Sequence, residues 1–385
     1  MIKIENNSMC SGCAACFSAC PRKCIQMQED IEGFLYPVIQ EGCVDCGICN
    51  NVCPFLRNEK RDIVHKAWAA YASDSVVRNN SSSGGVFSLI AKKIIEEGGI
   101  VYGAAFSEDW KTVNHIGSTN YELFQSSKYV QSRIGYSFID VRNSLKAKQK
   151  VVFSGTPCQV AGLKSFLGKE YPNLICIDVI CHGVPSPLLW AKYVEHLQLK
   201  HGKSIEKINF RNKRKGWINF CFYTKQNGRD YFCSHHNDPY MQIFLTNRSL
   251  RPSCYNCKIK EVGSSADITL GDLWGVENIA PEFRDDKGIS AVIIHTEKGE
   301  ELFLELDNCI KQSIDYNSVV SYNSPIYKSV NKPSDREDFF RDLSKLEFKQ
   351  VINKYGKPKL TAKQKIARTK VYKMVRPFIH KVFKF

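Results

Sequence analysis

Long apolar runs are absent from this sequence. No stretch of about eighteen or more consecutive apolar residues occurs, and a transmembrane helix needs a run of that length. The first ten residues, MIKIENNSMC, contain no apolar core of a secretory signal. We therefore expect a cytoplasmic protein that does not span a membrane.

Two common nucleotide-binding signatures are also missing. Neither G-x-G-x-x-G nor G-x4-G-K-[ST] occurs anywhere in the chain. A standard nicotinamide-binding Rossmann site and a P-loop are therefore not expected.

Acidic residues disappear near the C-terminus. The chain carries a formal net charge of +15, and no Asp or Glu follows Glu347. Residues 357–385 contain ten Lys and Arg, with apolar residues at roughly helical spacing and Pro377 to bend or break the helix. We assign residues 346–385 to a basic amphipathic tail, which suits an anionic surface on the inner face of a membrane. The alternatives are docking on the protein's own body or on an acidic partner such as ferredoxin.

Cysteine, by contrast, is abundant. The 385 residues, enough for two or three domains, include 17 cysteines. Without an export signal, these are better explained as reduced metal ligands than as a disulfide scaffold. Two runs share one spacing: CSGCAACFSACP from Cys10 to Pro21, and CVDCGICNNVCP from Cys43 to Pro54.

Both runs follow the pattern C-x2-C-x2-C-x3-C-P. In bacterial ferredoxins with this pattern, three thiolates of one run bind one 4Fe–4S cluster and the fourth binds the other cluster. A zinc pair and disulfides are the alternatives, but zinc sites usually place two C-x2-C pairs further apart. The expected ligands of the first cluster are Cys10, Cys13, Cys16 and Cys53. The expected ligands of the second cluster are Cys20, Cys43, Cys46 and Cys49.

Residues 1–60 thus resemble a bacterial two-cluster ferredoxin, with an α+β ferredoxin-like fold. Cys24 is interpreted as a buried packing residue rather than a ninth ligand. The polar segment from Phe55 to Lys66 marks the boundary of this domain. Oxygen attacks exposed clusters of low potential, so we expect an oxygen-poor setting.

The segment from Asn79 to Phe106 predicts a helix followed by a buried strand. Its apolar residues have helical spacing after a Ser-rich start, in which Ser82 or Ser83 is a plausible N-cap. Gly84 and Gly85 expose backbone N–H groups at the positive end of the helix dipole, which suits a phosphate or diphosphate. Serine and glycine also begin helices that bind nothing.

Two further segments predict a parallel sheet. The segment from Lys150 to Gly168 predicts a strand, a tight turn and a helix that begins at Pro157, and Asn173 to Pro187 predicts the next strand. Ligands of such sheets bind at the C-terminal ends of the strands. The residues at these ends are Thr156, Cys158, Cys181 and His182.

The following region predicts a hairpin with Asn227-Gly228 at its tip and contains one more C-x2-C pair, Cys254 and Cys257. The basic stretch from Phe210 to Trp217 could suggest nucleic acid. We prefer contact with an anionic cofactor or substrate, and no nucleic-acid partner is expected.

Six motifs resemble one family over most of residues 65–320. They are SSSGGVFS, SSKYVQS, SGTPCQVAGLK, CHGVPSP, LRPSCYNC and ADITLGDLWG. They look like the family of beta subunits of the hydrogenase and formate dehydrogenase that use the deazaflavin coenzyme F-420. With the ferredoxin-like segment in front, the chain is similar to fused bacterial and archaeal members of that family. Residues 61–345 would form the family domain.

The resemblance implies an α/β domain with a mixed sheet that binds FAD without a Rossmann fold, and a third 4Fe–4S cluster. The implied cluster ligands are Cys158, Cys181, Cys254 and Cys257. The implied flavin-binding residues are Ser82, Ser83, Gly84, Gly85, Val86, Lys128 and Tyr129. A thiolate at Cys158 would be favoured by the nearby helix start. Cys176 is an alternative ligand, but the alternation of its strand places it in the core. Cys221, Cys233 and Cys309 are interpreted as packing residues.

Together these features predict an iron–sulfur flavoprotein oxidoreductase. Clusters carry single electrons, whereas a flavin also exchanges hydride, so the chain would connect the two kinds of chemistry. The substrate would be organic or the deazaflavin coenzyme, the partner would be ferredoxin or another redox protein, and no catalytic residue is assigned. One alternative is an electron-transfer subunit without its own substrate chemistry. Another is a protein that binds nucleic acid or membrane and uses its metals structurally.

Overall fold

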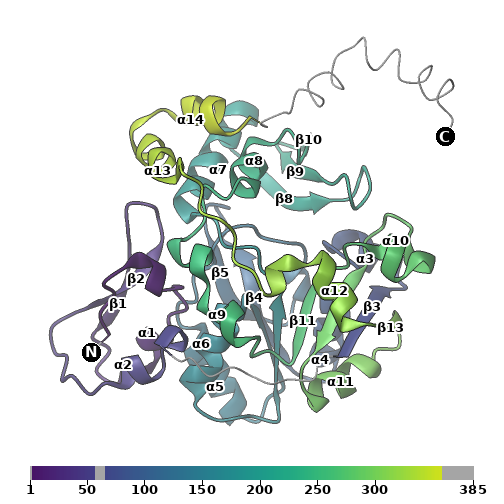
Figure 1. Cartoon of the computed structure of the whole chain (residues 1–385), viewed down its shortest axis with the longest axis horizontal. Helices are drawn as coiled ribbons and strands as arrows, with labels where there is room; N and C mark the ends of the chain where they lie inside the picture. The colour runs from purple at the N-terminus through teal and green to yellow at the C-terminus, as the bar shows by residue number, and fades with distance from the viewer. Residues whose placement is uncertain (1, 57–65, 358–385) are drawn as a thin grey trace.

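The computed structural model describes residues 2–56 and 66–357. These residues form sheets of two, three and eight strands. In Figure 1 a small N-terminal unit lies beside the largest sheet, and a cap of helices with a three-stranded sheet lies above it. No helix in the described ranges is both long and apolar enough to cross a membrane.

The N-terminal unit consists of two similar halves around a hairpin. Its elements are η1 (Asn7–Met9), α1 (Ala15–Ala19), β1 (Ile25–Glu29), β2 (Leu35–Ile39), α2 (Ile48–Asn51) and η2 (Pro54–Leu56). Helix α1 follows Ala14 with φ 60°, and α2 follows Gly47 with φ 75°. These left-handed residues occupy the same position in the two cysteine runs, so both runs turn into their helices in the same way.

The eight-stranded sheet is mixed, and its order is β13-β3-β12-β11-β7-β6-β4-β5. Its strands are β3 (Lys66–Ala72), β4 (Ile100–Phe106), β5 (Val113–Ser118), β6 (Val151–Gly155), β7 (Leu174–Val179), β11 (Ile268–Asp272), β12 (Ser290–Ile294) and β13 (Cys309–Ile314). The predicted strand–helix–strand unit is confirmed, because β6 and β7 pair in parallel. Strands β4, β6, β7 and β11 form the parallel part, so their C-terminal ends meet at one edge.

Helices cover this sheet and carry the loops at its edge. They are α3 (Ser75–Asn80), α4 (Val86–Glu96), α5 (Ser137–Lys146), α6 (Pro157–Leu167), α9 (Lys258–Val262), α10 (Val276–Ile279), α11 (Glu297–Leu304) and α12 (Tyr316–Tyr322). The short 3-10 helices are η3 (Tyr121–Phe124), η4 (Pro252–Asn256), η5 (Pro281–Phe283) and η6 (Ser324–Ile326). Helix α6 begins at Pro157 as predicted and has a capping box between Thr156 and Gln159.

The cap packs an antiparallel sheet against four helices (Figure 1). Its elements are α7 (Pro187–His201), β8 (Ile205–Asn212), β9 (Cys221–Gln226), β10 (Arg229–Ser234), α8 (Pro239–Leu245), α13 (Arg336–Lys345) and α14 (Phe348–Tyr355). The predicted hairpin is confirmed, and Asn227 and Gly228 both have positive φ at its turn. The buried rings of Trp190, Phe210 and Tyr240 pack together, with Trp190 5.0 Å from Phe210 and 5.1 Å from Tyr240 between ring centroids. This packing fixes β8, which extends into the site described below.

The segment expected to form a basic tail begins inside the cap. Helix α14 packs against α13, α8 and α7, and its Val351 is fully buried. Residues 358–385, which carry most of the basic charge of that prediction, lie outside the described residues.

The hairpin turn of the N-terminal unit is held by the larger domain. Phe34 is fully buried in the core of the cap, and the Ser186 hydroxyl donates to the Glu32 carbonyl at 2.5 Å. The Glu32 carboxylate accepts from both terminal nitrogens of Arg336, at 2.8 and 2.5 Å. The Arg336 side chain is 4% exposed and that of Glu32 15% exposed, so this ion pair is largely removed from water.

Replacing Arg336 by Leu should release this hairpin. The substitution leaves the Glu32 carboxylate buried without a cation, a loss of about 3–5 kcal/mol for comparable pairs. We expect much faster amide hydrogen exchange in β1 and β2. The matched control is Lys332→Leu, which removes an exposed pair with Glu337 and should change little. Equal exchange of the hairpin in both variants would contradict this role.

Candidate functional site

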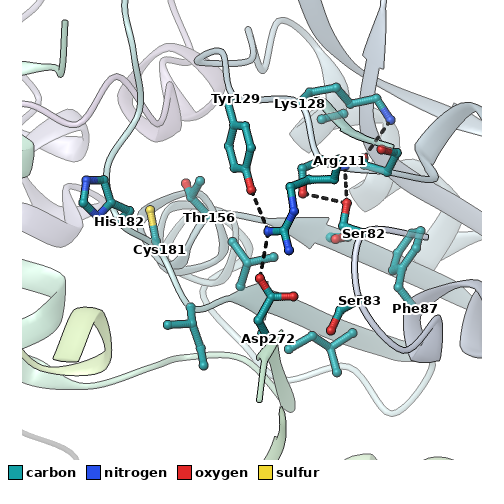
Figure 2. A pocket seen from close by; sticks show the side chains of 18 of the residues that line it. Ser82, Ser83, Phe87, Lys128, Tyr129, Thr156, Cys181, His182, Arg211 and Asp272 are labelled. Carbon is teal, nitrogen blue, oxygen red and sulfur yellow. Dashed lines mark hydrogen bonds and ion pairs between the residues drawn. The ribbon is translucent and has the colours of Figure 1, made fainter. Parts of the chain in front are cut away.

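A cavity of about 510 Å³ lies at the C-terminal edge of the parallel strands. Its walls come from the ends of β6, β7 and β11, from the loop that precedes α4, from the segment 125–132 and from Arg211 of β8. Figure 2 shows Arg211 in the middle of this lining, between Tyr129 and Asp272, with Cys181 and His182 on another wall. The cavity therefore lies where ligands of such sheets usually bind.

The loop before α4 approaches the neighbouring backbone so closely that only glycine fits. A Cβ atom at Gly84 would lie 2.3 Å from the Ala70 carbonyl oxygen. Gly85, with φ +94°, is the N-cap residue of α4, and no side chain caps that helix. The prediction that Ser82 or Ser83 is the N-cap is therefore wrong.

Both serines have tertiary partners instead. The Ser82 hydroxyl oxygen accepts from the Ser127 backbone N–H at 2.7 Å, and the Ser83 hydroxyl donates to the Ile289 carbonyl at 2.7 Å. Ser82, Ser83, Gly85 and Val86 all line the cavity. The first turn of α4 therefore faces the cavity with backbone N–H groups that no side chain caps.

Lys128 and Tyr129 also line the cavity. The Lys128 ammonium donates to the carbonyls of Leu123 at 2.9 Å and Gln125 at 2.8 Å, and burial lowers the pKa of Lys128 to about 7. The Tyr129 ring stacks on Phe244 with 4.9 Å between ring centroids. Both side chains thus order the segment that forms this wall.

Arg211 carries two donors without a partner in the described residues. Its Nη1 donates to Asp272 Oδ2 at 2.8 Å and to the Tyr129 hydroxyl at 3.1 Å, while Nε and Nη2 are buried and unbonded. The side chain is 5% exposed, and its guanidinium lies 4.3 Å from the centroid of the Phe220 ring. Asp272 Oδ1 accepts from Trp217 Nε1 at 3.0 Å. Buried donors of this kind suit an anionic or carbonyl oxygen of a ligand.

The sequence did not single out Arg211. It indicated a basic stretch around it, but nothing in the spacing separates Arg211 from Arg214, which is exposed. The available signal was the alternation of β8, which buries Phe210 in the cap while its neighbour contacts the end of β11.

The N-terminal unit brings together two groups of four cysteines. The first cysteine set, which lines one small hollow, is Cys10, Cys13, Cys16 and Cys53. The second cysteine set is Cys20, Cys43, Cys46 and Cys49, which line another hollow together with Cys24. These are the groupings that the spacing predicts. Backbone N–H groups donate to sulfur in both sets, from Gly12 to Cys10 at 3.4 Å and from Ile2 to Cys49 at 3.1 Å.

The second cysteine set lies nearer the surface. Cys43 and Cys46 are exposed, whereas Cys13 and Cys16 of the first set are buried. Cys24 is buried, and its sulfur lies 3.4 Å from that of Cys20, so this side chain packs directly beside the second set.

The third cysteine set comes from three separate places in the larger domain. Cys158 is in the first turn of α6, Cys181 follows β7, Cys254 lies in η4 and Cys257 ends η4. The Val184 N–H donates to Cys254 Sγ at 3.4 Å, and Thr156 Oγ1 lies 3.2 Å from Cys158 Sγ. The Val184 contact directs a polar hydrogen at the Cys254 sulfur, as the groups that surround metal-bound thiolates do.

Burial dominates the acidity of these thiols. Burial, together with the neighbouring sulfurs, raises the pKa of Cys158 to about 11 and that of Cys254 to about 12. The expectation that the start of the helix favours a Cys158 thiolate is therefore wrong for the metal-free protein. Thiolates become stable here only when a cation is bound, as metal binding requires.

The first and third sets lie close together. Cys53, Cys158 and Cys257 pack around one small apolar cluster of Phe55, Ala161 and Ile259. On the same helix, a Cβ atom at Gly162 would lie 2.9 Å from Cys13 Sγ. Cys181 also lines the cavity, so the third cysteine set is adjacent to the cavity as well as to the first set.

Two further cysteines lie inside the large sheet. Cys176 is fully buried in β7, where burial raises its pKa, and Cys309 is buried in β13. Within the described residues no three His, Cys, Asp or Glu side chains are grouped tightly enough to hold a single metal ion. A four-iron cubane places each thiolate on a different iron and therefore needs a wider group.

Comparison with known proteins defines the class and then the family. Residues 9–56 match the family described as "4Fe-4S dicluster domain", which makes the chain an iron–sulfur redox protein. Residues 148–314 match the family described as the C terminus of the beta subunit of coenzyme F420 hydrogenase/dehydrogenase. The chain therefore contains a region that matches the C terminus of this family of beta subunits, preceded by a dicluster domain.

Two curated relatives match most of the chain. One is the F subunit of the F(420)H(2) dehydrogenase of Methanosarcina mazei, 24% identical over 325 residues that cover 78% of this chain and 83% of the relative. Another is "Coenzyme F420-dependent sulfite reductase" of Methanocaldococcus jannaschii, 23% identical over 326 residues that cover 78% of this chain and 46% of the relative.

A solved structure of the F420-reducing [NiFe] hydrogenase complex from Methanosarcina barkeri is also similar. It has a TM-score of 0.43 and 16% identity, and the match covers 77% of this chain and 91% of that chain.

Replacing Cys254 by Ser should remove one cluster and leave two. We expect the iron content of anaerobically purified protein to fall from about twelve to about eight atoms per chain, because each cubane holds four irons. The matched control is Cys309→Ser, which alters a buried cysteine away from all three sets and should leave the iron content unchanged. Equal iron contents in the two variants would show that the third cysteine set does not bind a cluster.

Proposed function

We propose that this chain is an iron–sulfur flavoprotein oxidoreductase. It passes electrons between ferredoxin-type 4Fe–4S clusters and FAD, and so reduces or oxidises an organic substrate or a deazaflavin coenzyme. The observation that supports this best is the position of Cys181, which belongs to the third cysteine set and also lines the cavity. A redox group in the cavity would contact a cluster in the third set.

The cysteines provide a route from the surface to the cavity. The exposed Cys43 and Cys46 place the second set within reach of a one-electron partner, such as ferredoxin or another redox protein. The first set packs against both others. Its Cys16 shares an apolar cluster with Cys49 of the second set, and its Cys53 packs with Cys158 and Cys257 of the third. Apolar side chains fill part of the contact between the first and third sets.

The residues around the cavity fit a flavin nucleotide. The uncapped first turn of α4 suits a diphosphate, and the missing Cβ of Gly84 lets this loop pack directly against β3. The unbonded Nε and Nη2 of Arg211 can donate to oxygens of a flavin ring or of a substrate. When bound, FAD would supply the exchange between single electrons and hydride.

Asp272 holds Arg211 in the orientation that this binding requires. It binds one end of the guanidinium through Oδ2 and Trp217 through Oδ1, so the other nitrogens stay directed away from the pair. The Phe220 ring beneath the guanidinium keeps water from that face.

A second candidate is an electron-transfer subunit without its own substrate chemistry. The Methanosarcina mazei relative is one subunit of a dehydrogenase, which favours this candidate. In that case a stable catalytic partner should co-purify with the chain. We also propose that the basic residues 358–385 dock on an anionic membrane surface from the cytoplasmic side.

Rapid mixing with a reduced bacterial ferredoxin tests the proposed route. We expect the flavin absorbance of the anaerobic wild-type protein to be lost as the ferredoxin is oxidised. Cys254→Ser should keep its flavin yet reduce it much more slowly, while Cys309→Ser should behave as the wild type. Equal rates in all three proteins would show that the third set is not on the route.

Replacing Arg211 by Gln should weaken flavin binding. Hydrogen bonds from a charged donor contribute about 1.5–3 kcal/mol, so we expect affinity to fall about ten- to one-hundred-fold. Equilibrium dialysis of the flavin measures this change. The control is Arg214→Gln, which alters an exposed arginine of the same stretch. An unchanged affinity in Arg211→Gln would assign the two unbonded donors to another ligand.

A further inference from the structure

Arg251 is a fully buried cation at the contact of the two domains. Its side chain is 0% exposed, and it is among the largest fully buried side chains in the described residues. It immediately precedes η4, and the Cys254 N–H donates to the Arg251 carbonyl at 2.9 Å. Its guanidinium reaches across to the N-terminal unit, where Nε donates to the Cys10 carbonyl at 2.7 Å. Arg251 therefore connects a residue of the first cysteine set with a residue of the third.

All hydrogen-bond acceptors of this guanidinium are neutral. Besides the Cys10 carbonyl, Nη2 donates to the Leu35 carbonyl at 2.9 Å and Nη1 to Gln131 Oε1 at 3.0 Å. The ring of Tyr36 lies 4.2 Å from the guanidinium carbon. Uncharged acceptors satisfy the donors of an arginine but leave its positive charge uncompensated.

The other buried arginines differ in this respect. Five arginines are buried in the described residues, and four of them pair with a carboxylate. Those four pairs are Arg78–Asp285, Arg211–Asp272, Arg248–Asp335 and Arg336–Glu32. Arg251 has no ion pair in the described ranges, although a buried unpaired charge is strongly unfavourable. Some other negative charge near Arg251 should therefore balance it.

The cysteines of the two sets lie close to Arg251 and can carry that charge. Arg251 binds the backbone of Cys10, and a Cβ atom at Gly12 would lie 2.9 Å from its Nη1. On the other side, Cys254 is one turn of η4 away. Four thiolates give a cubane a net negative charge, and each electron that it accepts adds one more. The attraction to a buried cation is only weakly screened by salt.

We propose that Arg251 is the shared counter-cation of the clusters held by the first and third cysteine sets. It raises the reduction potentials of both clusters together and leaves the cluster of the second set unaffected. The inference rests on the proposed function, because it requires a cluster in the third set.

Redox titration followed by electron paramagnetic resonance tests this proposal. In Arg251→Gln we expect the potentials of two clusters to shift to more negative values and the third potential to stay unchanged. Arg251→Lys, which keeps the charge, should remain near the wild type. The matched control is Arg336→Gln, which alters another buried arginine at the same contact, but one that is paired with Glu32. It should free the hairpin, as we expect of Arg336→Leu, and yet move no potential.

A second variant neutralises the cation without removing it. Gln131→Glu places a carboxylate where the amide oxygen now accepts from Arg251 Nη1, and the adjacent guanidinium favours the ionised form. We expect the same two negative shifts as in Arg251→Gln. This variant decides the question if Arg251→Gln does not fold.

Iron analysis of the same samples distinguishes failure of the proposed role of Arg251 from failure of the proposed function. About twelve irons per chain with unmoved potentials would reject the role of Arg251 and leave the proposed function intact. About eight irons in the wild type would reject the third cluster and with it a shared cation. A shift in Arg336→Gln equal to that in Arg251→Gln would assign the effect to loosened domain contacts and overturn the proposal.

Discussion

The close contact between the N-terminal unit and helix α6 is the constraint on which the rest depends. At Gly162 there is no room for a Cβ atom beside the Cys13 sulfur, so the first cysteine set lies directly on the helix that carries Cys158. Arg251 binds the N-terminal unit from the start of η4, and Arg336 binds it from α13. Electron transfer between clusters requires short and fixed separations, and the proposed relay depends on these contacts for both.

The same contact explains where the cavity lies. The third cysteine set takes its members from the ends of strands and from η4, so it lies between the N-terminal unit and the C-terminal edge of the sheet. Cys181 faces both the set and the cavity. The cap completes the cavity from the other side, because the packing of Trp190 and Phe210 fixes the strand that carries Arg211.

How much of this could be predicted depends on the range of the interactions. The two ferredoxin-type cysteine groupings, the parallel unit of β6 and β7 and the Asn227-Gly228 turn follow from local spacing and local backbone preference, and the sequence predicts each of them. The prediction of Ser82 or Ser83 as an N-cap fails because their hydroxyls bind groups 45 and 206 residues away. Arg211 and Arg251 could not be distinguished from other basic residues, since their roles depend on burial and on partners that only the folded chain brings together.

The most direct test of the relay is a paired measurement of iron and flavin on one anaerobically purified sample of the whole chain. We expect about twelve irons, four for each of three cubanes, together with about one FAD per chain. About eight irons without flavin would leave a ferredoxin-type unit joined to a domain with a different role, and would contradict the proposed connection between the cysteine sets and the cavity.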